Sequence, residues 1–158
     1  MRCFTTISSL VLGLGAISQL LPGTLAADVL LFSLGNYQQL VSDSGTNITF
    51  LEVNFDKPPQ EPRARWVIDK RDDGSAYTIM NQLTKTYVYF PEWEAGSVGV
   101  LSDEAAGDFL LRGGISEDLT FLEHKATGLF MTQQGNHVVL AAANNTNNQI
   151  WKTKPPTA

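Results

Sequence analysis

The sequence of 158 residues contains a single cysteine, Cys3. One cysteine cannot form an intramolecular disulfide, and the chain has no cluster of cysteine and histidine at the spacing of a structural zinc site. We therefore expect core packing alone to hold the fold, without a metal or another cofactor.

Positive charge is also scarce, because 11 Lys and Arg stand against 16 Asp and Glu and give a net charge of −5. Proteins that bind nucleic acid need a broad cationic surface. The composition therefore disfavours a nucleic-acid partner.

Short catalytic motifs are missing as well. The sequence has no His-Glu-x-x-His or Gly-x-Ser-x-Gly pattern, no phosphate-binding or dinucleotide loop and no EF-hand. His124 is interpreted as a hairpin-turn residue, and the acidic pair Asp72-Asp73 is typical of a solvated turn. These features predict a protein that is not an enzyme.

The N-terminal segment has the layout of a secretory signal peptide, with the positive Arg2, a mostly apolar stretch over residues 7–21 and small residues at 24–26. A membrane anchor is the alternative, but this stretch of about 15 residues is shorter than the roughly 20 that cross a bilayer. We expect residues 1–26 to be cleaved after Ala26, and the mature chain, residues 27–158, to be secreted into the extracellular space without inserting into a membrane.

Two sequons, which begin at Asn47 and Asn144, can accept N-glycans in a eukaryotic secretory pathway. The alternative is that these asparagines serve only as turn residues. Together, the sequons and the signal peptide predict a glycoprotein.

Short runs rich in β-branched and aromatic residues dominate the mature chain, and no segment keeps a helical apolar pattern through three turns. About a dozen short strands at this density indicate an all-β sandwich or small barrel. The clearest strand candidates are residues 36–41, 48–53, 66–68, 76–80, 86–90, 109–111, 119–123, 129–132 and 137–140.

An aromatic residue closes each third of the mature chain at separations of 43 and 42 residues. These residues are Trp66, Phe109 and Trp151. The strands that open the thirds are assigned around Tyr37, Tyr77 and Leu119, at separations of 40 and 42 residues. The spacing predicts one domain of three repeats, at approximately residues 28–68, 69–111 and 112–153, closed around a pseudo-threefold axis.

The triplicated pattern resembles the β-trefoil family, in particular ricin B-type lectins and the small fungal trefoil lectins and protease inhibitors. The most specific match is Gln149-Ile150-Trp151, which fits the Gln-x-Trp signature of ricin-type repeats. The first two repeats keep the aromatic residue but have Ala64 and Gly107 in place of the glutamine.

The resemblance implies a sugar site that combines an early Asp, an aromatic platform and an Asn directly before the Gln-x-Trp. In the third repeat Asn148 and Gln149 match this pattern, whereas Thr132 and Ala141 stand near the positions of the Asp and the platform. Trp93, between two glutamates in the second repeat, is a different candidate platform, with a packing role on the hairpin cap as its alternative.

A second function on the same fold is protease inhibition. Prolines stiffen residues 57–65, and Arg63 in this segment could fill an acidic specificity pocket, unless the segment is an ordinary connection. The sequence therefore predicts a secreted, non-catalytic carbohydrate-binding protein with a glycan or glycoprotein as partner, and a secreted inhibitor of a protease as the alternative.

Overall fold

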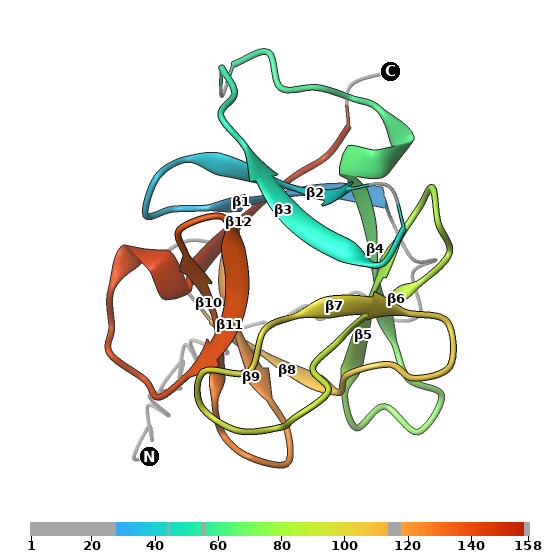
Figure 1. The fold of residues 1–158 in the computed structure, drawn as a ribbon, viewed down its shortest axis with the longest axis vertical. Coiled ribbons are helices and arrows are strands. Elements are labelled where there is room, and N and C mark those ends of the chain that lie inside the picture. Colours follow the sequence, from blue (N-terminus) through green and yellow to red (C-terminus); the bar gives the residue numbers. More distant parts are fainter. Residues whose placement is uncertain (1–27, 44, 55, 114–117, 157–158) are drawn as a thin grey trace, which may run out of the picture.

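The computed structural model describes residues 28–156 apart from residues 44, 55 and 114–117 (Figure 1). The predicted signal peptide lies outside the described residues. Within them the chain forms strands and two short 3-10 helices, η1 (Pro62–Ala64) and η2 (Asn147–Gln149). No helix of this described part is both long and apolar enough to cross a membrane.

The strands fall into three sets of four that follow one another along the chain. The first set is β1 (Asp28–Ser33), β2 (Gln38–Asp43), β3 (Asn47–Leu51) and β4 (Arg65–Lys70). The second set is β5 (Tyr77–Asn81), β6 (Tyr87–Tyr89), β7 (Val100–Ser102) and β8 (Phe109–Gly113). The third set is β9 (Leu119–His124), β10 (Phe130–Gln134), β11 (His137–Ala141) and β12 (Ile150–Lys154).

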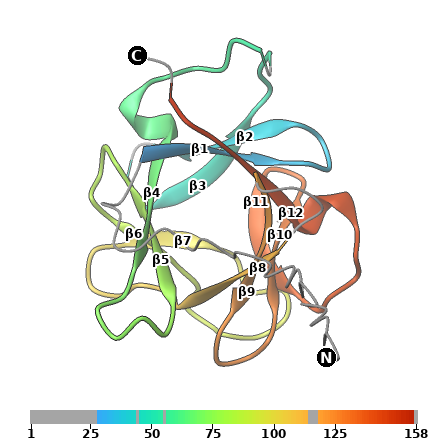
Figure 2. The ribbon, with the colours of Figure 1, turned by 180° about the vertical axis from the view of Figure 1, so that it is seen from behind.

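The first and last strand of each set close into a barrel. Antiparallel pairs run β1–β4, β4–β5, β5–β8, β8–β9, β9–β12 and β12–β1, so that the sixth pair returns to the first strand (Figures 1 and 2). The two inner strands of each set form the hairpins β2–β3, β6–β7 and β10–β11. This arrangement confirms the predicted all-β, triplicated β-trefoil.

Closure of the barrel protects the chain against edge-to-edge aggregation, because it pairs strand edges that would otherwise stay open. The hairpins also connect with one another. Gly96 in the loop between β6 and β7 donates its backbone N–H to the carbonyl of Leu140 in β11 at 2.8 Å, and Val98 bridges to Val139. Backbone pairing thus joins the second repeat to the third.

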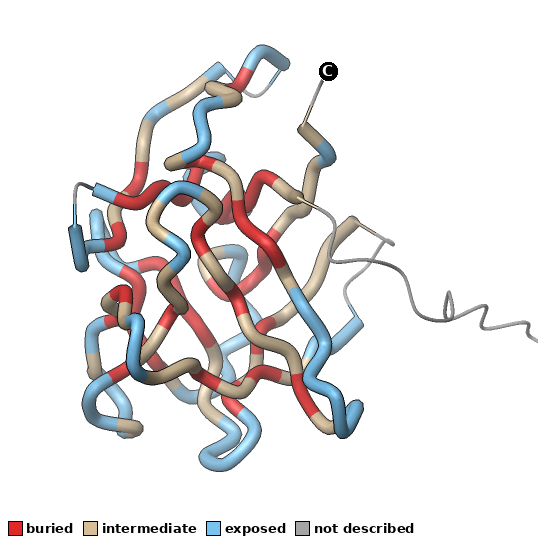
Figure 3. The backbone as a smooth tube through the Cα atoms, turned by 90° about the vertical axis from the view of Figure 1, so that its right-hand side faces the viewer, coloured by how far each residue is buried: buried red, intermediate tan, exposed pale blue. Residues whose placement is uncertain are grey.

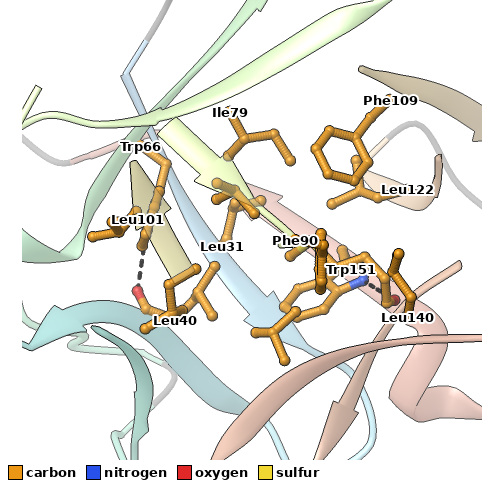
Figure 4. Packing of buried hydrophobic residues seen from close by; sticks show 14 of the residues in the cluster. Leu31, Leu40, Trp66, Ile79, Phe90, Leu101, Phe109, Leu122, Leu140 and Trp151 are labelled. Atoms are coloured by element: carbon orange, nitrogen blue, oxygen red, sulfur yellow. Dashed lines mark hydrogen bonds between the residues drawn. The ribbon is translucent and has the colours of Figure 1, made fainter. Parts of the chain in front are cut away.

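One continuous core fills the barrel and reaches under the hairpins, and buried segments alternate with exposed turns along the backbone (Figure 3). All three closing aromatics, Trp66, Phe109 and Trp151, are fully buried, as the repeat pattern predicts (Figure 4). Burial of large rings is a major source of stability, at about 25 cal/mol for each square ångström of apolar surface removed from water.

The two closing tryptophans each satisfy a buried carbonyl. The indole N–H of Trp66 donates to Leu40 O in β2 at 2.9 Å, and that of Trp151 donates to Met131 O in β10 at 2.9 Å (Figure 4). Phe109 has no such donor. In the second repeat the backbone N–H of Gly107 takes over and donates to Val88 O in β6 at 3.0 Å.

The first repeat opens one strand earlier than the pattern around Tyr37 predicts. Its opening strand is β1, and residues 36–41 contribute to the turn and to hairpin strand β2. The prediction is wrong because β1 is an apolar run, buried from Leu30 to Phe32, without the alternation expected of a half-buried strand. Tyr37 instead takes a left-handed backbone, φ 53°, in the turn after the opening strand, as Gly128 does with φ 69° in the third repeat.

We predict that Trp151→Phe lowers the free energy of unfolding by about 2 kcal/mol or more, because the Met131 carbonyl then stays buried without its donor. Equilibrium unfolding in denaturant, followed by circular dichroism, measures this. Trp93→Phe is the matched control, since the same chemical change at this half-buried ring should cost less. Equal losses in the two variants would contradict a special role for the indole N–H.

Candidate functional site

A surface hollow of about 560 Å³ lies where the second repeat meets the third. Its walls come from β6, the loop after β6, the segment before β8, and the turn between β9 and β10. We call it the Trp93 hollow; its lining residues are Tyr89, Trp93, Ala106, Asp108, His124, Lys125, Ala126 and Thr127. The N–H of Lys125 donates to Asp108 O at 2.9 Å and fixes the turn against the segment before β8.

Aromatic rings build one side of the hollow. The imidazole of His124 stacks on Trp93 with ring centres 3.9 Å apart and planes 9° from parallel. Tyr89 meets Trp93 edge to face at 5.2 Å, and Phe90 packs against the same indole at 5.8 Å from the core side. Trp93 is therefore held in place by its neighbours, although it lies at the surface.

Gly107 makes room for this arrangement. A Cβ on Gly107 would lie 2.7 Å from the ring of Phe109, which is closer than carbon atoms pack, and 3.0 Å from the indole of Trp93, which is a tight contact. The glycine thus lets the backbone reach Val88 O while two large rings close over it.

Polar groups border the rings. The carboxylate of Asp108 pairs with the guanidinium of Arg71, and the Thr127 hydroxyl lies 2.9 Å from His124 Nδ1. The exposed Lys125 adds an ammonium group. Rings beside a carboxylate, a hydroxyl and an amine can hold a ligand that has both an apolar face and several hydroxyls.

His124 is the last residue of β9, and its backbone closes the following turn through a bond from Gly128 N to His124 O at 2.9 Å. Its side chain is only 5% exposed, which the interpretation as a turn residue does not capture. Burial lowers the pKa of His124, and the nearby Asp108 carboxylate partly opposes that shift. The imidazole that stacks on Trp93 is therefore the neutral form near pH 7.

The signature glutamine of the third repeat is placed inside the fold. Gln149 is 1% exposed, its amide donates to Thr132 Oγ1 at 3.0 Å and to Ala142 O at 2.8 Å, and its Oε1 accepts the N–H of Asn144 at 2.9 Å. These bonds hold the loop that leads from β11 to β12. Gln149 has a structural role here, and its part in a sugar site stays a prediction.

Asn148 lies beside the turn of the first repeat, where its Cα and Cβ would meet a Cβ on Gly35 at 3.1 Å. Its amide donates to Gln133 O at 3.2 Å, and its Oδ1 accepts the hydroxyl of Thr146. Asn148 bonds to Gln133, and its neighbour Gln149 bonds to Thr132, so hydrogen bonds tie this segment to β10. Ala141 has no ring that could serve as a platform. Sugar binding by Asn148 is likewise still a prediction.

The two predicted sites share one sequence position of the repeat, the residue three before the closing aromatic. Aligning Phe109 with Trp151 matches Ala106 with Asn148 and Gly107 with Gln149. Ala106, which lines the Trp93 hollow, therefore stands at the position that Asn148 has in the third repeat. The sequence singled out Trp93, but it missed Tyr89, Asp108 and His124, which come from three separate segments and share no local motif.

Arg63, the candidate inhibitory residue, lies in η1. Its guanidinium donates to the carboxylate of Glu61 at 2.7 Å, and its carbonyl accepts the amide of the buried Asn81 at 2.9 Å. The backbone at Arg63 is thus bound to the barrel. Of the sequon residues, both Asn47 at the start of β3 and Asn144 in the loop before η2 are exposed; their glycosylation stays a prediction.

Acidic and histidine side chains do not gather elsewhere into a metal site: among residues 28–156, with the gaps named above, no three lie in an arrangement that could hold a metal ion.

Comparison with known proteins identifies relatives only at the level of structure. No protein-family profile matches the sequence, and no curated protein sequence matches it. The agglutinin of Rhizoctonia solani superposes with a TM-score of 0.68 at 17% identity, over 83% of this chain and 96% of that one. The Macrolepiota procera ricin B-like lectin, solved in complex with lactose, gives 0.69 at 12% identity over 85% and 100%. SeviL, solved bound to asialo-GM1 saccharide, gives 0.67 at 13% identity over 84% and 100%. At these identities the likeness establishes the shared fold.

We predict that Gly107→Ala displaces Trp93 and lowers the free energy of unfolding by about 1 to 3 kcal/mol, because the new methyl group overlaps two rings. The fluorescence spectrum of the protein reports the displacement, and unfolding in denaturant reports the stability. Gly113→Ala is the matched control, since nothing lies within 4 Å of a Cβ at that position. An unchanged spectrum and stability in Gly107→Ala would contradict the packing described for the hollow.

We further predict that the free energy of unfolding falls as the pH drops below about 6.5, the pKa of an unperturbed histidine. The unfolded chain takes up a proton there before the folded chain does, because the pKa of His124 is lowered in the fold. The contribution is fully present above that pH and is lost on the way down to the folded pKa.

Unfolding in denaturant between about pH 7.5 and about pH 5.5, with an NMR titration of the imidazole, tests the effect. The His124→Gln variant should lose the part of the pH dependence that falls in this window. A midpoint for His124 above that of a free histidine would contradict the prediction.

Proposed function

We propose that the protein is a secreted, non-catalytic, carbohydrate-binding protein of the ricin B-like lectin type, which binds a glycan or glycoprotein in the Trp93 hollow. The observation that carries this proposal is the hollow itself, where fixed aromatic rings border a carboxylate, a hydroxyl and an ammonium group. Sugars present an apolar C–H face and a ring of hydroxyls, and this combination of groups suits both.

The structural neighbours support the same class of ligand. Two of them were solved with sugars, lactose in one and asialo-GM1 saccharide in the other. Secretion rests on the N-terminal segment, whose charged start, apolar stretch and small residues fit a signal peptide. The two exposed sequon asparagines suit passage through a secretory pathway.

The alternative of a protease inhibitor gains no support from the placement of Arg63. An inhibitory residue has to enter the cleft of its protease, whereas the Arg63 side chain pairs with Glu61 and its carbonyl is bonded to Asn81. We therefore retain carbohydrate binding as the proposed function, and inhibition of trypsin serves as a competing outcome in the test.

To test the proposal, the full chain is expressed in a eukaryotic secretory host. The protein purified from the medium is then applied to a glycan array. We expect binding to a defined group of glycans. Trp93→Ala, which removes a stacking surface, and Asp108→Asn, which replaces one charged acceptor oxygen with an NH2 donor, should each weaken it about tenfold or more. Calorimetry measures the affinities, and thermal unfolding verifies that each variant is folded.

Asn148→Ala is the control, because it alters the third repeat at the position that aligns with Ala106 of the Trp93 hollow. Loss of binding in Asn148→Ala alone would move the site to the third repeat. A secreted, folded protein that binds no glycan on the array would overturn the proposed function, and inhibition of trypsin that Arg63→Ala abolishes would establish the alternative.

A further inference from the structure

A second hollow of about 420 Å³ adjoins the Trp93 hollow. It is bordered by the charged turn between β4 and β5 and by side chains of two neighbouring strands, Thr78 in β5 and Tyr87 in β6. We call it the polar hollow. Its hydroxyl and charged groups contrast with the rings of the Trp93 hollow, so the two would bind different parts of a ligand.

The two hollows share a wall. Ala106, whose side chain is a single methyl group, lines both of them. Arg71 lines the polar hollow and Asp108 the Trp93 hollow, and the ion pair between these two side chains connects the hollows. Tyr87 and Tyr89 stand two residues apart in β6, so they lie on one face of the strand with one ring in each hollow.

From this continuity we infer that the two hollows form one groove for a neutral oligosaccharide. One sugar unit contacts the rings around Trp93, and the next unit bonds its hydroxyls to the polar hollow. The inference rests on the proposed function and deepens it, because it adds the size and charge of the glycan. A single sugar would leave the polar hollow unused.

The charges along the groove favour a neutral ligand. One carboxylate and one lysine line the Trp93 hollow, and three carboxylates with two cationic groups line the polar hollow. Hydrogen bonds from the side chain and backbone of Ser75 lower the pKa of Asp73 and keep that carboxylate ionised. The excess of negative charge, together with the net charge of −5, disfavours a glycan that carries carboxylates.

The experiment measures calorimetric affinities of the full secreted chain for two neutral series, galactose, lactose and lacto-N-tetraose, and N-acetylglucosamine, chitobiose and chitotriose. In the series that binds, we expect the affinity to rise about tenfold from the single sugar to the two-unit sugar, which two or more added hydrogen bonds can supply. The anionic 3′-sialyllactose should bind more weakly than lactose if the lactose series binds.

A double variant, Thr78→Val with Tyr87→Phe, removes two hydroxyls from the polar hollow without changing its charge. It should cancel the gain from the second sugar unit and leave the affinity for the single sugar unchanged. Tyr77→Phe is the matched control, because Tyr77 neighbours Thr78 in β5 but lines neither hollow. Trp93→Ala should weaken binding of every length.

Equal affinity for one and two units, or a double variant that binds like the wild type, would overturn the groove while carbohydrate binding stands. Failure of all six neutral sugars to bind would also overturn it. The proposed function itself fails only when the glycan array shows no binding at all, so the two failures are distinguishable.

Discussion

The structure depends on the pairing of one buried carbonyl in each repeat. Leu40, Val88 and Met131 lie in the hairpin strands β2, β6 and β10. The carbonyls of Leu40 and Met131 accept the indole N–H of the closing residues Trp66 and Trp151, whereas the carbonyl of Val88 accepts the backbone N–H of Gly107. A buried carbonyl without a donor costs about 1 to 3 kcal/mol. In a barrel that has to rely on packing, three such losses would remove much of its marginal stability.

The second repeat meets this constraint by a different route, and the Trp93 hollow is the consequence. Without an indole at Phe109, the donor is the backbone N–H of Gly107, which brings the main chain close to two rings. No side chain fits at Gly107, and only a methyl group stands at Ala106. The third repeat carries Asn148 and Gln149 at the aligned positions, whereas in the second repeat the rings of Phe109 and Trp93 cover Gly107. Trp93, stacked on His124, forms one side of the hollow.

The fold was accessible from the sequence because its signals are local and repeated. Closing aromatics at a near-constant spacing and short strands between turns are sufficient for a trefoil, whereas β1 was missed because a strand buried on both faces shows no alternation. The site was accessible only in part. Trp93 stands out as an aromatic ring between charges, but Asp108 and His124 reach it through pairing of β8 with β9, which no local pattern reveals.

The contrast between the repeats also shows that a residue of a sequence signature can have a structural role. Gln149 matches a motif associated with sugar binding. In this fold its amide nitrogen donates to Thr132 and Ala142, and its amide oxygen accepts from Asn144. The internally bonded Gln149 stabilises its own loop, whereas Ala106 in the second repeat lines the Trp93 hollow. The hollow is already formed because the ring of Trp93 packs on the core through Phe90. A ligand would therefore bind without the entropy cost of ordering these side chains. Threefold repetition thus lets equivalent positions differ within one closed barrel, with an internally bonded amide in the third repeat and a hollow beside the second.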